Sequence, residues 1–384
     1  MSSELHPVTG AWRPGDPAGQ RRFLTLDRKL ALDSGAILDG VEVAYETWGT
    51  LNDDASNAVL LCHAWTGDSH AAGRAGPGHP TPGWWESIVG PGAAIDTDRW
   101  FVVCSNVLGG CQGTTGPSSL DPNGAGPYGS RFPVVTIRDM VRAQARLADH
   151  LGVRRWHSVI GGSMGGMQVL EWAVTFPDRV CSIVPIASCL QASAQQIAWE
   201  SIGRRAILHD PNFRGGDYYD APAGEGPHRG LSTARMVAQV TFRSDNVFNQ
   251  KFGRDIAGGD HLAPAEQQFE VERYLEYHGD KLSRRFDANS YLLIGRAMDL
   301  HDIARGRGGL EAAIKRISAP ALSIGIVSDM LYPSYQQLQI RDALAAHDVR
   351  AEYVEIDSPH GHDSFLIDLD QVAPPITRFL DSID

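Results

Sequence analysis

A glycine-flanked serine is the residue of this chain best placed to act as a nucleophile. Ser163 lies in GGSMGG (161–166), which fits the pattern G-x-S-x-G between an apolar run and a helical pattern from residue 167. Glycines let the backbone crowd at a sharp strand-to-helix turn, so that a serine at its tip exposes its hydroxyl. The N-terminus of the following helix offers unpaired N–H groups to a developing negative charge. The pattern therefore predicts nucleophilic catalysis at Ser163.

A serine nucleophile needs a general base, and the base needs a carboxylate to orient it. In α/β-hydrolases these residues follow in the order serine, acid, histidine. Asp329 comes directly after the late apolar run at 320–327, where the acid is expected. His360 and His362 both lie in the loop after the last predicted strand. Their positions alone leave both open as the base.

An oxyanion hole in this chemistry uses two backbone N–H groups. One comes from the residue after the nucleophile, which is Met164. The other comes from the loop after an early strand, and the loop at 62–68 leaves such a strand. Ala64 or Trp65 would supply the second donor.

Buried strands alternate with helices on either side of this serine. The run at 41–48 alternates apolar and polar residues, which is typical of a half-buried antiparallel strand. Continuous apolar runs predict strands covered on both faces. They lie at 58–62, 100–105, 181–187 and 320–327, with a further strand at 351–356 and helices at 136–151 and 335–347. This order predicts an α/β fold with a mostly parallel sheet and helices on both faces.

The alternation stops between the strands at 181–187 and 320–327. Residues 190–316 show helical patterns, for example at 195–208 and 263–277, and no convincing buried strand. We interpret 190–316 as an inserted helical lid. The core then comprises residues 21–189 and 317–384, and residues 1–20, which are polar and rich in Pro and Gly, form a loose arm.

Composition limits the partners. A net charge of −12 argues against nucleic acid or an anionic membrane surface as the main partner. The N-terminus lacks the apolar core of a signal peptide, and no apolar run approaches a membrane span. Five cysteines without C-x-x-C spacing favour neither disulfides nor structural zinc. We expect a cytoplasmic protein with no metal.

Seven segments together resemble the homoserine O-acetyltransferases, a family that also includes homoserine and serine O-succinyltransferases. The resemblance extends from about residue 20 to the end of the chain. The segments are HAWTGDSH (63–70), GWWESIVGPG (83–92), SNVLGGCQGTTGPSS (105–119), RFPVVTIRDMV (131–141), GGSMGGMQVLEWA (161–173), GDKLSRRFDANSYL (279–292) and GHDSFL (361–366).

The resemblance implies an α/β-hydrolase fold with a helical lid, usually dimeric through that lid. It also assigns roles to residues of this sequence. The implied triad is Ser163, Asp329 and His362, the implied oxyanion donors are the N–H groups of Trp65 and Met164, and Arg235 and Asp363 match the residues that bind the amino acid.

The implied reaction moves an acetyl group from acetyl-CoA, a co-substrate rather than a bound cofactor, to L-homoserine. Trp65 stands where the family often has leucine, and Phe242 where it often has tyrosine. A bulkier Trp65 could narrow the acyl pocket, and Phe242 lacks one hydroxyl. A succinyl donor, serine as acceptor, and a carboxylesterase with the same triad stay open as alternatives.

Overall fold

The computed structural model describes residues 5–124, 126–257 and 269–383. Within these residues an eight-stranded sheet has the order β1-β4-β8-β5-β9-β10-β11-β12. The strands β1 and β4 are antiparallel to their neighbours, and all pairs from β8 to β12 are parallel. The bounds are β1 (Arg22–Thr25), β4 (Glu42–Trp48), β5 (Ala58–Cys62), β8 (Phe101–Ser105), β9 (Ser158–Gly162), β10 (Ile183–Ile186), β11 (Ala321–Ile326) and β12 (Ala351–Ile356). The predicted mostly parallel sheet is confirmed.

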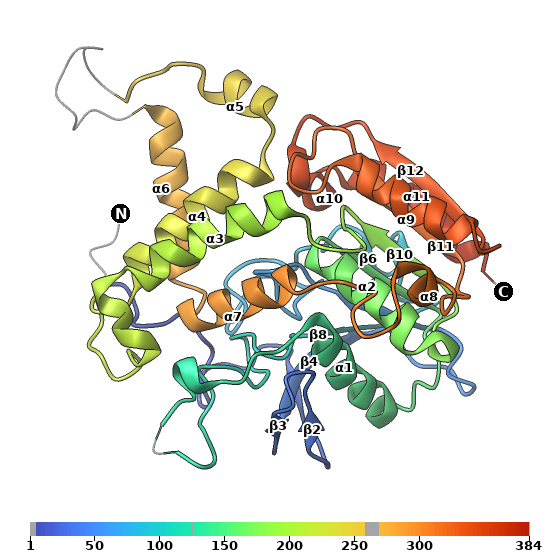
Figure 1. Cartoon of the computed structure of the whole chain (residues 1–384), viewed down its shortest axis with the longest axis horizontal. Helices are drawn as coiled ribbons and strands as arrows, with labels where there is room; N and C mark the ends of the chain where they lie inside the picture. The colour runs from blue at the N-terminus through green and yellow to red at the C-terminus, as the bar shows by residue number, and fades with distance from the viewer. Residues whose placement is uncertain (1–4, 125, 258–268, 384) are drawn as a thin grey trace.

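Both faces of this sheet are covered (Figure 1). Alternation along β9 sends Val159 into one core and Ile160 into the other, and both side chains are fully buried. The first core packs under α1 (Ile137–Leu151), α2 (Met164–Thr175), α8 (Leu310–Ile314) and α9 (Ser334–Ala345), and the second under α11 (Leu369–Asp381). The short elements are β2 (Leu30–Ala31), β3 (Ile37–Leu38), β6 (Val89–Gly90), β7 (Ile95–Asp96) and α10 (Ser364–Ile367).

In the described part of the chain, five helices precede α8 between β10 and β11. They are α3 (Ala194–Leu208), α4 (His228–Phe242), α5 (Asp245–Phe252), α6 (Glu270–Ser283) and α7 (Ala288–Asp299). The helix predicted at 195–208 is confirmed as α3. The start of the helix predicted at 263–277 lies outside the described residues, and α6 continues to Ser283. None of the described helices is long and apolar enough to cross a membrane. The domain boundaries stay predictions.

The N-terminal segment differs from the loose arm that we expected. The Thr9 hydroxyl donates to Asp287 at 2.8 Å, and the N–H of Trp12 donates to the Cys111 carbonyl at 2.9 Å. Ala11 between them is buried. The expectation is wrong for residues 9–12 because docking here uses backbone N–H groups and one hydroxyl, which leave no apolar periodicity in the sequence.

Candidate active site

Ser163 lies at the strained turn that joins β9 to α2. Its φ of 59° and ψ of −123° place a residue with a side chain in a region that such residues rarely adopt. Gly165 is required here, because an added Cβ would lie 2.1 Å from the Cys62 carbonyl oxygen. The Ser163 N–H donates to the Ile186 carbonyl at 2.9 Å. The neighbouring strands thus hold the serine in its strained conformation.

His362 pairs with the acid that follows β11. Its Nδ1 lies 2.6 Å from Asp329 Oδ2, and both side chains are buried. The other oxygen of Asp329 accepts the N–H groups of Leu331 and Tyr332, each at 2.8 Å. His362 Nε2 is buried and has no hydrogen-bond partner within the described part of the chain. This geometry suits a tautomer with the proton on Nδ1, which leaves Nε2 free to accept one.

The two histidines of this loop therefore have different surroundings. His360 is about one-third exposed, and its Nδ1 lies 2.9 Å from Asp368 Oδ2. The structure brings His362, and not His360, to Asp329.

The surroundings of His362 shift its pKa. Burial alone would lower the pKa of His362, but the charge and hydrogen bond of Asp329, with Asp363 nearby, raise the pKa above its usual value. A base must be neutral to take a proton from Ser163, so activity rises with pH through this pKa.

We expect the acidic limb of kcat/KM to have its midpoint above about pH 6.5, the ordinary histidine value. Initial rates of ester cleavage from pH 5 to pH 9 would measure it. His360→Gln should leave the midpoint in place, whereas a wild-type midpoint below that of free histidine would contradict the assignment.

The loop after β5 carries Trp65, and hydrogen bonds to β4 anchor it. The Ser69 hydroxyl donates to Glu46 at 2.8 Å, and His70 Nδ1 lies 2.9 Å from the same carboxylate. In the described part of the chain, the N–H groups of Trp65 and Met164 donate to no recorded acceptor. Both are therefore free to face a substrate oxygen, and their oxyanion role stays a prediction.

A possible metal site lies beside this loop: Glu46, His70 and His79 offer three buried ligand atoms within 4.8 Å of one another. The two imidazoles are stacked, with centroids 3.7 Å apart and planes 9° from parallel. Stacked rings do not point their lone pairs at one ion, and the Gln20 N–H already donates to His79 Nε2. The group fits an anchor of the Trp65 loop better than a metal site.

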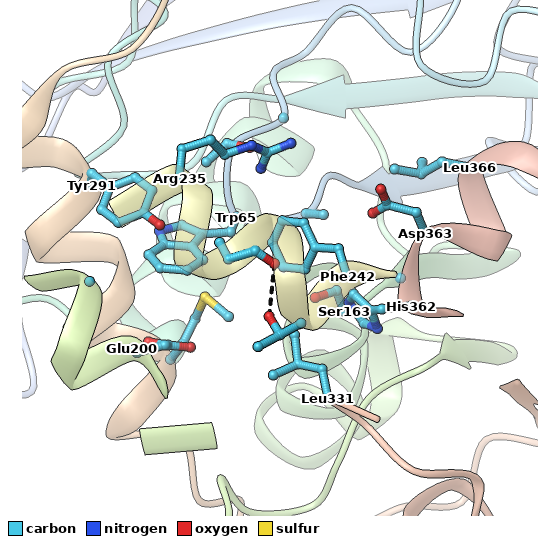
Figure 2. Close-up of a pocket in the computed structure, with 18 of the residues that line it drawn as sticks. Trp65, Ser163, Glu200, Arg235, Phe242, Tyr291, Leu331, His362, Asp363 and Leu366 are labelled. Carbon is cyan, nitrogen blue, oxygen red and sulfur yellow. Dashed lines mark hydrogen bonds between the residues drawn. The ribbon is translucent and has the colours of Figure 1, made fainter. Parts of the chain in front are cut away.

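A cavity of about 200 Å³ lies between the lid and the strand ends. Figure 2 shows the side chains of Trp65, Ser163, Arg235, His362 and Asp363 around it. Five of the seven residues singled out from the sequence thus line one space. Asp329 lies behind His362, and Met164 is the buried first residue of α2.

Arg235 and Asp363 face this cavity without pairing with each other. The Arg235 guanidinium lies 5.0 Å over the Phe242 ring and has no carboxylate partner among the described residues. Burial lowers the pKa of Arg235, while the nearby Asp363 opposes that shift. Arg243 lies 3.4 Å from Asp363, a contact that the sequence did not suggest. An unpaired cation and a carboxylate in one cavity suit a ligand that carries both charges.

Sequence reasoning also missed Glu200, a buried acid that lines the cavity from α3. Its spacing to Arg204 is typical of an ordinary ion pair on a helix surface, so the sequence held no specific signal.

Three features together define an α/β-hydrolase. They are the strained serine between β9 and α2, the chain order Ser163, Asp329, His362, and the sheet covered on both faces. A family model described as the alpha/beta hydrolase fold matches residues 57–369. A homoserine O-acetyltransferase from Thermobifida fusca (strain YX) is 52% identical, over 97% of this chain and 97% of its own length. The chain belongs to the homoserine O-acetyltransferase family.

Two solved structures share the complete fold. A homoserine O-acetyltransferase from Bacillus anthracis superimposes with a TM-score of 0.88 at 29% identity, covering 94% of this chain and 98% of that one. Esterase E22 superimposes with a TM-score of 0.86 at 31% identity, covering 94% and 99%. A hydrolase and a transferase therefore share this architecture.

Proposed function

We propose that this protein transfers an acetyl group from acetyl-CoA to the side-chain hydroxyl of L-homoserine, giving O-acetyl-L-homoserine and CoA in methionine biosynthesis. The observation that carries the proposal is that Arg235, which has no carboxylate partner among the described residues, lines one cavity together with Asp363 and Ser163. An esterase has no need for two charges that fit a free amino acid. The curated relative at 52% identity is named for this reaction.

In the first half-reaction Ser163 attacks the thioester carbonyl. His362 Nε2 takes the hydroxyl proton, and Asp329 holds the imidazolium in place. The N–H groups of Trp65 and Met164 stabilise the oxyanion. The C–S bond breaks, the thiolate takes the proton from His362, and CoA leaves an acetyl ester on Ser163.

In the second half-reaction homoserine occupies the space that CoA has left. Asp363 binds its ammonium group and Arg235 its carboxylate. His362 removes the proton of the side-chain hydroxyl, whose oxygen attacks the acetyl ester. The ester bond to Ser163 breaks, and the Ser163 oxygen recovers the proton from His362. Lid helices over the cavity would reduce competition from water.

Several basic side chains lie together beside the cavity, which supports an anionic acyl donor. Burial and the charges of Arg235, Arg243, Lys281 and Lys251 lower the pKa of His278 to about 4. A second cavity of about 290 Å³ shares Thr66, Gly67, Trp84 and Arg285 with the first, and Lys281 also lines it. This local positive field, in a chain of net charge −12, suits the phosphates of CoA.

Substitution of Arg235 tests the proposed binding of the homoserine carboxylate. Replacing Arg235 with glutamine should raise KM for homoserine about 100-fold, because it removes two charge-assisted hydrogen bonds to the carboxylate. Cleavage of p-nitrophenyl acetate, which needs no amino acid, should fall far less. Arg229→Gln, an exposed change on the same helix, is the matched control. An unchanged KM for homoserine in Arg235→Gln would contradict the assignment.

Free thiol release tests the proposed function. Acetyl-CoA and succinyl-CoA are each assayed with homoserine, with serine and with no acceptor. Release that requires both acetyl-CoA and homoserine supports the proposal. Preference for succinyl-CoA or serine keeps the mechanism and changes the specificity, since one methylene discriminates by only about 1–3 kcal/mol.

Carboxylesterase activity is the second candidate, favoured by the likeness to esterase E22. In that case thiol release would proceed with no acceptor, because water would reach the acyl-enzyme.

We also propose a cytoplasmic homodimer. Exposed apolar side chains on α3, α4 and α6 support the association: Ile202, Val240 and Tyr277.

A further inference from the structure

Three charged side chains form a buried cluster against the cavity. Glu200 and Arg204 lie one turn apart on α3, and Asp299 ends α7. Arg204 lies 2.5 Å from Asp299 Oδ2 and 3.5 Å from Glu200 Oε2. Glu200 is 8% exposed and lines the cavity, whereas Arg204 and Asp299 are not among the lining residues. The carboxyl of Glu200 thus stands between the cavity and the Arg204 guanidinium.

The cluster lies on the side of the cavity away from Asp363. Figure 2 places Glu200 on the opposite side from Asp363, with Trp65 on the Glu200 side. A Cβ added to Gly295 would lie 2.9 Å from the Trp65 ring and 3.4 Å from Glu200 Oε2, so these two side chains meet there. In the proposed reaction the acyl oxygen lies near the Trp65 N–H, and the Trp65 ring lies beside Glu200, so we assign the acyl chain to this side of the cavity. We call the part of the cavity lined by Trp65, Glu200, Tyr291 and Met298 the acyl end.

The guanidinium of Arg204 is paired within the protein, without a ligand. Burial and the neighbouring Asp299 raise the pKa of Glu200 well above its usual value, against the opposing effect of Arg204. Arg204 lies 2.5 Å from Asp299, and the exposed Arg296 lies 3.6 Å from the same carboxylate oxygen. The guanidinium that Glu200 covers therefore already has a carboxylate partner. A second carboxylate brought there by a substrate would be buried without a counter-ion of its own, which is strongly unfavourable.

We propose that Glu200 determines which acyl group the enzyme accepts, by covering Arg204 so that an uncharged acetyl group fits and an acyl carboxylate finds no cation. This specificity role rests on the proposed acyl transfer. Without Glu200, the guanidinium fork of Arg204 would reach the acyl end and could pair with the terminal carboxylate of a succinyl group. Glutamine at position 200 would still separate Arg204 from the cavity, because it has nearly the same shape as glutamate and no charge.

Four proteins and three donors test the proposal. Wild type, Glu200→Ala, Glu200→Gln and the exposed lid control Glu225→Ala are assayed with acetyl-CoA, butyryl-CoA and succinyl-CoA, with homoserine as acceptor. Butyryl and succinyl chains have the same number of carbons and differ in the terminal charge. We expect the succinyl-to-acetyl ratio of kcat/KM to rise at least about tenfold in Glu200→Ala, and the succinyl-to-butyryl ratio to rise with it. Glu200→Gln and Glu225→Ala should retain the wild-type ratios.

Two results would overturn the proposal. In one, Glu200→Ala lowers all three activities together with unchanged ratios, which is the signature of a structural role. In the other, butyryl-CoA gains as much as succinyl-CoA, so that space and not Arg204 accounts for the change. Should the alanine variant not fold, Glu200→Ser provides the same truncation. If wild type shows no homoserine-dependent thiol release from acetyl-CoA, the proposed function fails; if it does and the ratios stay constant, only the role of Glu200 fails.

Discussion

Replacing Ser163 with alanine is expected to lower kcat for acetyl transfer by roughly 10⁴–10⁶-fold. The hydroxyl is the only group lost, and in the proposed mechanism it forms the covalent bond on which both half-reactions depend. Alanine keeps a Cβ at φ 59°, so the turn between β9 and α2 bears the same strain and the fold should persist. Thiol release and the thermal midpoint, measured on the same preparation, separate lost chemistry from lost structure.

The acyl-enzyme provides a second measurement of this effect. Mass spectrometry of wild type incubated with acetyl-CoA and no acceptor should detect an acetyl adduct on the peptide that contains Ser163. Ser163→Ala should carry none. Turnover of the variant within about tenfold of wild type would show that another group attacks the thioester, and the ping-pong scheme would have to be abandoned.

Replacing Asp329 with asparagine should lower kcat about 10⁴-fold while the loop keeps its shape. Asparagine can still accept the N–H groups of Leu331 and Tyr332 through its amide oxygen. Its NH₂ would face His362 Nδ1 and donate to it, which moves the imidazole proton to Nε2. With a proton on Nε2 the histidine cannot accept one from Ser163.

Asp368→Asn is the matched control, because Asp368 pairs with His360 as Asp329 pairs with His362. It makes the same change from carboxylate to amide at the residue between α10 and α11, outside the cavity. We expect its kcat to stay within about threefold of wild type, as for a substitution with no role in the reaction. Equal losses in both variants would mean that loop stability, not the tautomer of His362, sets the rate.

Local sequence patterns determined much of the sheet and the nucleophile. The continuous apolar runs at 58–62 and 320–327 became β5 and β11, because strands buried on both faces need apolar residues at every position. The glycines around Ser163 predicted its turn, since backbone crowding at one point is a local requirement. Chain order and position also indicated Asp329, Met164 and the loop that carries Trp65, whereas resemblance to a family selected His362 and added Arg235 and Asp363. All of these residues lie in or behind one cavity.

Tertiary structure alone decided what depends on contacts between distant segments. His360 and His362 share every local signal, and only the folding of β11 beside the last loop brings Asp329 to one of them. The arm at residues 9–12 docks through backbone hydrogen bonds and one bond from the Thr9 hydroxyl to Asp287, 278 residues away, which no local pattern encodes. Glu200 and Arg204 resemble a surface pair on a helix until α7 places Asp299 against them, which leaves both carboxylates buried and Arg204 only partly exposed. Burial converts an ordinary ion pair into a group that can select a substrate, and burial is a property of the packed fold.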